Sequence, residues 1–194
     1  MQTAHAVHPL PPDIPRFRLS VRQYHRMIEA GILGEDDRIE LIEGELTVMP
    51  PINPRHAGKT TRLTRIFSEC VGDSALISVQ NPLVLGDRSE PEPDLMLLRP
   101  RKDYYETANP GPEDVLLVVE IADTSLEYDR NVKIPLYAAN GIPEVWLLNL
   151  QNERLEIHLD PGPSGYRKLL LPDPEHMVAP VSLPQAAFQV GMLW

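Results

Sequence analysis

The sequence predicts a single domain with a mixed α/β or α+β fold, in which helices flank one central β-sheet. Segments with strand character alternate along the chain with helical ones, which is the order found when helices pack on a mixed sheet. The chain has 194 residues, a length that suits one domain with one sizeable core. Residues 115–121, VLLVVEI, are nearly all apolar, so they are predicted to form a central strand buried on both faces.

Each element is predicted from its apolar spacing and from the signals at its ends. Ser20 is expected to cap the first helix and Gly31 to end it. Pro135 has no backbone N–H, so it must lie early in its helix or kink it. In chain order, the predicted elements are a helix at 21–29, two strands within 38–49 joined by a turn at Glu43-Gly44, a helix from about 55 to 70, a strand-like segment at 75–85 broken at Asn81-Pro82, strands at 95–98 and 115–121, a helix at 129–139, strands at 145–150 and 155–159, a strand-like segment at 166–171 and an irregular apolar tail.

The N-terminal 17 residues are predicted to be a disordered lead-in, and residues 18–194 to form the single domain. The lead-in is rich in proline and small residues, and it lacks the basic head and apolar core of a signal peptide. Cys70 stands alone, which excludes an intrachain disulfide and a multi-cysteine metal cluster and fits the reducing cytoplasm. No run of about 18 apolar residues is present, so no membrane span is expected.

The charge balance is acidic, with a formal net charge of −10 and an isoelectric point near 5.0. A protein that simply coats DNA would be basic, so that class is disfavoured. A nuclease is not excluded, because clustered carboxylates suit a magnesium site and a local basic strip can still contact phosphate.

Three carboxylates occur next to predicted strands. Asp94 opens one strand, Glu120 lies near the end of the most apolar strand, and Glu40 interrupts an apolar alternation. A carboxylate is costly to bury unless it is paired or bound to a metal, and Mg²⁺ prefers oxygen ligands. The alternative is that Glu120 only marks the solvent end of its strand.

Four segments carry a resemblance to a known family: RIELIEGELTVMPPINPRH (38–56), SEPEPDLMLLRPRKDYY (89–105), EDVLLVVEIADTSLEYDRNVK (113–133) and PLYAANGIPEVWLLNL (135–150). In this order, and over roughly residues 18–190, they resemble the Uma2 family of restriction-endonuclease-like proteins. The resemblance implies the PD-(D/E)xK nuclease fold, a divalent metal (Mg²⁺, with Mn²⁺ as a substitute) and hydrolysis of phosphodiester bonds in DNA. By analogy with the fold, a homodimer is also expected.

The resemblance also implies roles for particular residues. It makes Pro93-Asp94 the Pro-Asp element and Glu120 the acidic residue of the second element, so Asp94 and Glu120 are the expected metal ligands. The N-terminal acidic residue is then Glu40, which matches the family's Glu-Leu-Ile-x-Gly string; Glu43 is the weaker choice. A main-chain carbonyl near Ile121 is a further expected ligand.

The lysine departs from the usual pattern of the fold. That pattern places a lysine two residues after the second acid, where this chain has Ala122. The family instead carries a lysine in the following helix, which corresponds to Lys133 here. The alternative is an ordinary i,i+4 pair between Asp129 and Lys133. A catalytically inactive DNA-binding or scaffold protein, and a hydrolase acting on a non-DNA substrate, therefore stay open as alternatives.

Candidate phosphate contacts lie at the start of the second long helix. His56 matches a histidine of the family pattern and is expected to contact phosphate or assist proton transfer, or else to begin the helix without a role. Arg55, Lys59 and Arg62 form a basic stripe on the same helix. A solvated helix face is the alternative for this stripe.

Overall fold

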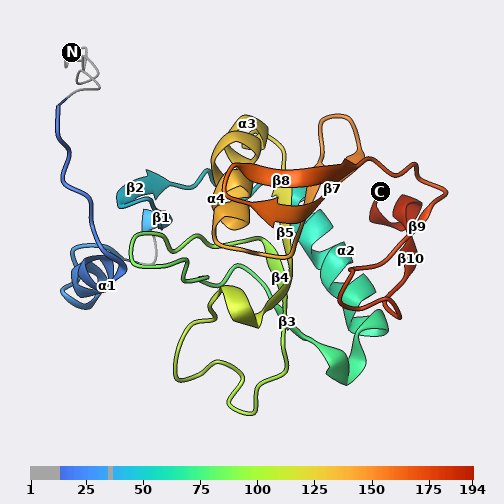
Figure 1. Ribbon diagram of the computed structural model, residues 1–194, viewed down its shortest axis with the longest axis horizontal. Coiled ribbons are helices and arrows are strands. Elements are labelled where there is room, and N and C mark those ends of the chain that lie inside the picture. Colours follow the sequence, from blue (N-terminus) through green and yellow to red (C-terminus); the bar gives the residue numbers. More distant parts are fainter. Residues whose placement is uncertain (1–13, 35–36) are drawn as a thin grey trace.

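A computed structural model of the chain describes residues 14–34 and 37–194, and it contains a mixed six-stranded sheet (Figure 1). The strands lie in the spatial order β3-β4-β5-β6-β7-β8. The pair β5–β6 is parallel and the other neighbours are antiparallel. The strands are β3 (Leu76–Ser78), β4 (Leu95–Leu98), β5 (Val115–Ala122), β6 (Glu144–Asn149), β7 (Arg154–Gly162) and β8 (Gly165–Leu170).

Strand β5 is the predicted central strand, and all eight of its residues are buried. Successive side chains point to opposite faces of a sheet. Val119 and Ile121 pack in the core beneath α2 (Pro54–Cys70), whereas Val118 and Ala122 pack in the core beneath α4 (Ile134–Ala139). The helices therefore cover both faces of the sheet, as predicted.

Helix α1 (Val21–Glu29) has the predicted ends. The hydroxyl of Ser20 accepts the backbone N–H of Gln23, and the side chain of Gln23 accepts the backbone N–H of Ser20. This reciprocal capping box satisfies two donors that the first turn would otherwise leave without partners. Gly31 follows with φ of 68°, a left-handed conformation that glycine adopts without strain.

The predicted helix at 129–139 begins three residues earlier and contains a wide turn. It consists of α3 (Leu126–Tyr128), a π-helical segment η4 (Asp129–Lys133) and α4. Pro135 is the second residue of α4, and it cannot donate the regular backbone hydrogen bond. The π-helical turn comes directly before it, and such turns occur frequently at functional sites.

The strands β1 (Ile39–Ile42) and β2 (Glu45–Val48) form the predicted hairpin, separate from the main sheet. Glu43 and Gly44 have φ of 49° and 79°, as a tight two-residue hairpin turn requires. A Cβ at Gly44 would lie 2.8 Å from Cβ of Arg18, so a larger residue would displace the segment before α1. An antiparallel bridge between Leu41 and Glu90 ties the hairpin to the chain that leads into β4.

The remaining elements are short. Two prediction errors are visible: only three residues of the strand-like segment at 75–85 form β3, and the irregular tail contains the paired strands β9 and β10.

Of the lead-in predicted at 1–17, residues 1–13 lie outside the described part. Within that part, no helix is long and apolar enough to cross a membrane. The short elements are η2 (Gly72–Ser74), η3 (Pro112–Asp114), β9 (Met177–Val178), β10 (Phe188–Gln189) and η5 (Val190–Leu193).

Candidate active site

Four predicted residues from four separate segments line one pocket of about 310 Å³. Glu40 comes from β1, Asp94 from the residue before β4, Glu120 from β5 and Lys133 from η4. His56, in the first turn of α2, lines the same pocket.

Asp94 and Glu120 lie side by side because of the strand register. Leu95 pairs with Val119 in the antiparallel β4–β5 ladder, so the next position along places Asp94 opposite Glu120. Opposite residues of an antiparallel pair point to the same face. The backbone N–H of Asp94 lies 3.4 Å from Oε2 of Glu120. The two carboxylates therefore meet on one face at the end of the sheet.

The carboxylate of Asp94 is held by two donors on the same oxygen. The backbone N–H of Ile121 lies 2.8 Å from Oδ2, and Nε2 of His56 lies 2.9 Å from it. Burial lowers the pKa of His56, but the hydrogen bond to Asp94 and the charges of Asp94 and Asp129 together outweigh burial and raise it above the ordinary value. Oδ1 of Asp94 accepts from none of the described residues, which leaves one oxygen open to the pocket.

The first turn of α2 positions His56. Asn53 is the N-cap residue: its Oδ1 accepts the backbone N–H of His56 at 2.9 Å. Its Nδ2 donates to Asp123, which follows β5, also at 2.9 Å. One capping side chain thus joins the start of α2 to the end of the strand that carries Glu120.

Lys133 is buried against the carboxylates. It is 5% exposed, and its Nζ lies 2.8 Å from Glu120 and 3.4 Å from Glu40. Burial lowers the pKa of Lys133, but the surrounding acids, Glu120 first, outweigh this and raise it well above the ordinary value. Lys133 is therefore not in a solvated pair with Asp129, whose carboxylate accepts the hydroxyl of Ser125 at 2.7 Å.

Glu120 and Glu40 have further donors. The hydroxyl of Tyr137 donates to Oε1 of Glu120 at 2.5 Å, from a side chain that is fully buried. The hydroxyl of Tyr128 lies 3.2 Å from Oε1 of Glu40, and the backbone N–H of Glu92 lies 3.2 Å from its Oε2. Each carboxylate is thus held in place by a tyrosine.

Carboxylates outnumber cations in this pocket. Burial raises the pKa of Glu120 to about 8, against the opposing charge of Lys133. Burial likewise raises the pKa values of Asp129 and Glu92, and neighbouring carboxylates add to both effects. Burial is thus the first cause of these shifts, and the nearby carboxylates add to it. Six acids line the pocket: Glu40, Glu92, Asp94, Glu120, Asp123 and Asp129.

The donor set fits Mg²⁺ in an open site. Within residues 14–34 and 37–194, no group of three or more His, Cys, Asp or Glu side chains could hold a metal ion by itself. Mg²⁺ needs no such group, because one or two carboxylates with water and phosphate oxygens commonly complete its shell. Asp94 offers an open oxygen, and Glu120 has only a long contact to its Oε2.

A family model described as "Uma2: Putative restriction endonuclease" matches residues 21–191. The chain belongs to this family. A solved structure, titled as a putative nuclease belonging to DUF820 from Anabaena variabilis ATCC 29413, is similar in fold, with a TM-score of 0.67 and 18% sequence identity over 85% of this chain and 94% of that chain. No match was found among curated proteins. The restriction-endonuclease-like fold that the sequence predicts is confirmed.

The basic stripe on α2 of this Uma2 member faces away from the pocket. Lys59 donates to the carbonyl oxygens of Leu193 and Trp194, at 2.9 and 3.2 Å, and its ammonium lies 5.0 Å from the centre of the Trp194 ring. Arg62 donates to the carbonyl of Met192, and Arg55 pairs with Glu153. Lys59 and Arg62 thus hold the C-terminal segment, and Arg55 contacts the turn between β6 and β7. These contacts disfavour the predicted phosphate contacts for all three side chains.

Several pocket residues were not predicted from the sequence. Tyr128, Asp129 and Glu92 all line the pocket, and so does Arg38. Each lies within a segment that carries the Uma2 resemblance, which was the available signal. Glu43, the weaker choice for the N-terminal acid, lies in the hairpin turn and does not line the pocket.

Proposed function

We propose that this protein is a Mg²⁺-dependent endonuclease that hydrolyses phosphodiester bonds in DNA. The observation that carries the proposal is the convergence of Glu40, Asp94 and Glu120 in one pocket, with Lys133 buried against two of them. Membership of the Uma2 family, whose model is described as "Putative restriction endonuclease", supports the nuclease class.

Asp94 and Glu120 would hold the metal. When bound, Mg²⁺ supplies Lewis acidity and lowers the pKa of a water molecule. The Ile121 N–H and His56 keep Asp94 in a single orientation, and Tyr137 does the same for Glu120. Such supporting hydrogen bonds orient metal ligands and affect metal affinity.

Lys133 would act on the transition state. Its ammonium stays charged near neutral pH, because the surrounding acids raise its pKa. A fixed positive charge in a partly dry pocket stabilises negative charge that develops on phosphate oxygens. The side chain reaches Glu120 from η4 and so supplies the cation that Ala122 cannot.

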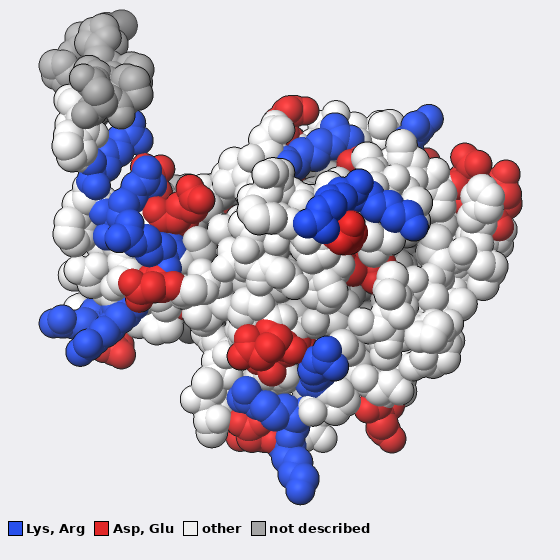
Figure 2. Space-filling view, in the orientation of Figure 1, with Lys and Arg blue, Asp and Glu red and all other residues white. Residues whose placement is uncertain are grey.

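The surface charge is compatible with DNA binding that depends on local contacts. On the face shown in Figure 2, Lys and Arg side chains are interspersed with Asp and Glu. With a net charge of −10, the whole chain repels DNA, so affinity must come from the cleft and its metal.

Nicking of supercoiled plasmid DNA tests the proposal. Wild type should nick DNA with Mg²⁺ or Mn²⁺ and stop when EDTA is added. Asp94→Asn should be inactive, whereas Asp173→Asn, the same change at an exposed loop residue, should be fully active. DNA binding without cleavage would favour the alternative of an inactive DNA-binding or scaffold protein. Cleavage of another phosphodiester or ester alone would favour a hydrolase with a different substrate.

We also propose a homodimer, because two-fold dimers are the commonest oligomers. Light scattering on the purified chain should give twice the 21.8 kDa of one chain. A mass of one chain at micromolar concentration would contradict this proposal without affecting the nuclease assignment.

A further inference from the structure

Arg38 is a second basic side chain in the pocket, and the proposed metal binding and catalysis give it no role. It lines the pocket, and its Nε is buried without a hydrogen-bond partner among residues 14–34 and 37–194. Lys133, by contrast, has two carboxylates within 3.4 Å. A buried guanidinium nitrogen without a partner is costly, so a ligand with several acceptor oxygens would stabilise it.

The backbone at Arg38 is held in an unfavourable conformation. Its φ is 46°, in the left-handed region that residues other than glycine rarely adopt. The carbonyl of Arg38 accepts the backbone N–H of Met49 at 2.8 Å, and Ile39 pairs with Val48 in the hairpin. The β1–β2 hairpin thus fixes the direction from which the side chain enters the cleft. Strain of this kind is found most often at ligand-binding and catalytic sites.

The pocket described above is the first lobe of a longer cleft. Beyond the carboxylates the cleft continues into a second lobe of about 330 Å³. The two lobes share four lining residues, Arg38, Met49, Glu92 and Asp94, so Asp94 and Arg38 stand at their junction. Residues of α1 and the segment after it form much of the far wall. Among the described residues that line the second lobe, Arg38 is the only cation.

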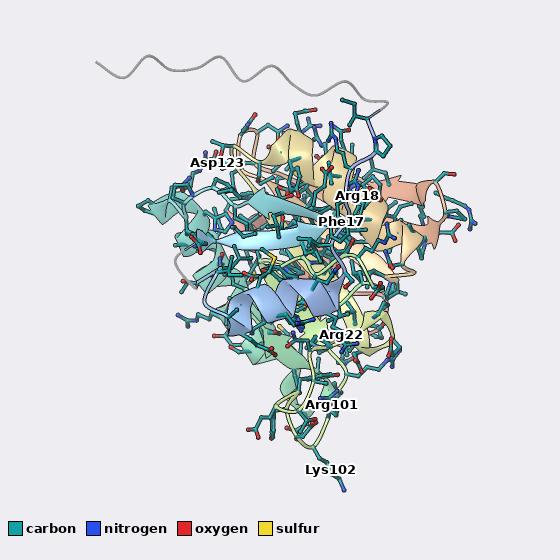
Figure 3. The ribbon with its side chains drawn as sticks, turned by 90° about the vertical axis from the view of Figure 1, so that its left-hand side faces the viewer. Phe17, Arg18, Arg22, Arg101, Lys102 and Asp123 are labelled. Carbon is teal, nitrogen blue, oxygen red and sulfur yellow. The ribbon has the colours of Figure 1, made fainter. Side chains whose placement is uncertain are left out.

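Two further basic residues, Arg101 and Lys102, lie far from the cleft. Figure 3 shows Arg101 and Lys102 at the opposite end of the molecule from Asp123, which lines the first lobe. Arg101 is also engaged, because it pairs with Asp103 through two nitrogens and stacks on the ring of Tyr105 at 3.9 Å. These groups therefore do not supply positive charge to the cleft.

We infer that Arg38 binds a phosphate next to the scissile one, so that the substrate is a polynucleotide strand running through both lobes. This inference rests on the proposed nuclease function. The planar guanidinium offers donors in a fork that matches phosphate oxygens, and its charge offsets the carboxylates at the junction. Arg38 is thus a substrate-binding residue, whereas Lys133 serves the reacting phosphate.

Two substrates separate this role from a catalytic one. A short single-stranded oligodeoxynucleotide has phosphates on both sides of the cleaved bond, whereas bis(p-nitrophenyl) phosphate has a single phosphate. Arg38→Gln should raise KM for the oligonucleotide about 10-fold, the usual scale for a lost charge-assisted hydrogen bond, and should leave hydrolysis of bis(p-nitrophenyl) phosphate unchanged. Arg154→Gln, the same substitution at an exposed residue of β7, is the matched control and should change neither.

Binding provides a second readout. The affinity of a fluorescein-labelled oligonucleotide, measured by anisotropy with Mg²⁺ at several salt concentrations, should weaken in Arg38→Gln. The slope against log salt should fall by about 0.7, as expected for one lost phosphate contact to a single strand. Arg38→Gly should show the same loss with unchanged or higher thermal stability, because glycine relieves the positive φ. That variant separates a binding defect from misfolding.

The outcomes are distinguishable from failure of the nuclease assignment. If wild type cleaves neither substrate, the nuclease assignment fails, and the anisotropy experiment still tests Arg38. An equal loss on both substrates in Arg38→Gln would overturn the inference, and so would an unchanged KM and salt slope.

Discussion

One π-helical turn, η4, carries two cations to two different sites: Arg130 to a single carboxylate and Lys133 to several. Arg130 pairs with Glu156 of β7, and His158 lies 3.7 Å from the same carboxylate. Burial raises the pKa of Glu156, but the nearby imidazole of His158 and the hydrogen bonds and charge of Arg130 together outweigh it and lower the pKa to about 2. Lys133, three residues along, faces the pocket, where the pKa of Glu120 is raised to about 8.

The difference is one of charge balance. At Glu156 two basic side chains lie beside one carboxylate, so this carboxylate has its counter-charge within the protein. In the cleft, one buried ammonium lies among several carboxylates, so negative charge is in excess there and a bound cation would offset it. The first arrangement stabilises the fold, and the second is suited to bind a metal ion.

The largest expected effect comes from the cleft carboxylates. Glu120→Gln should reduce Mn²⁺-dependent cleavage to background and greatly weaken Mn²⁺ binding in calorimetry, because a neutral amide is a poor ligand for a hard cation. Glu156→Gln, the same change at the carboxylate beside Arg130 and His158, should retain both cleavage activity and Mn²⁺ binding. Mn²⁺ should raise the melting temperature of wild type and Glu156→Gln only. Equal metal affinity in wild type and Glu120→Gln would remove the basis of the comparison.

The second effect separates Lys133 from metal binding. Lys133→Met should lower kcat by about 10²–10³-fold, the usual cost of losing one group that stabilises the transition state, while Mn²⁺ affinity changes little. Lys133→Arg should not fully restore the rate, since the guanidinium is wider and planar. Circular dichroism verifies folding in both variants. A loss of Mn²⁺ affinity as large as the loss of rate would instead make Lys133 a supporting residue of the metal site.

A smaller effect is expected in the pH dependence of stability. The lowered pKa of Glu156 contributes stability that is fully present above its ordinary value of 4.5 and is lost as the pH falls toward about 2. The contribution should be about 1–2 kcal/mol after a discount for the partly exposed Arg130. Urea unfolding between pH 5 and pH 3 should therefore show a steeper loss of stability in wild type than in Glu156→Gln. Parallel losses would indicate that the ion pair contributes nothing measurable.

The smallest effects are expected on the α2 stripe. Arg62→Gln should change DNA affinity less than about twofold, because its side chain holds the C-terminal segment. Lys59→Met should cost about 0.5–1 kcal/mol of stability through the lost contact with Trp194. A clear drop in DNA affinity in either variant, without a drop in stability, would restore the phosphate-contact prediction.

The sequence predicted the parts of the site that depend on local structure. Asp94 and Glu120 each adjoin a strand whose apolar run is visible, and the Uma2 resemblance identified Lys133. The direction in which the Lys133 side chain points depends on the π-helical turn η4. No sequence pattern predicted this turn. The contacts of Lys59 and Arg62 could not be predicted from the sequence, because their partners, residues 192–194, are about 130 positions away in the chain. Arg38 was overlooked because its importance lies in a positive φ and a missing partner, both tertiary features.

The most direct test of the account is a crystal of the wild-type protein soaked in Mn²⁺, with anomalous scattering used to locate the ion. The account predicts a peak within coordination distance of oxygens of both Asp94 and Glu120, about 2.0–2.2 Å, with Lys133 still against Glu120. The peak should be absent from Asp94→Asn crystals soaked in the same way. A fully soaked wild-type crystal without a peak between these two carboxylates would contradict the central claim.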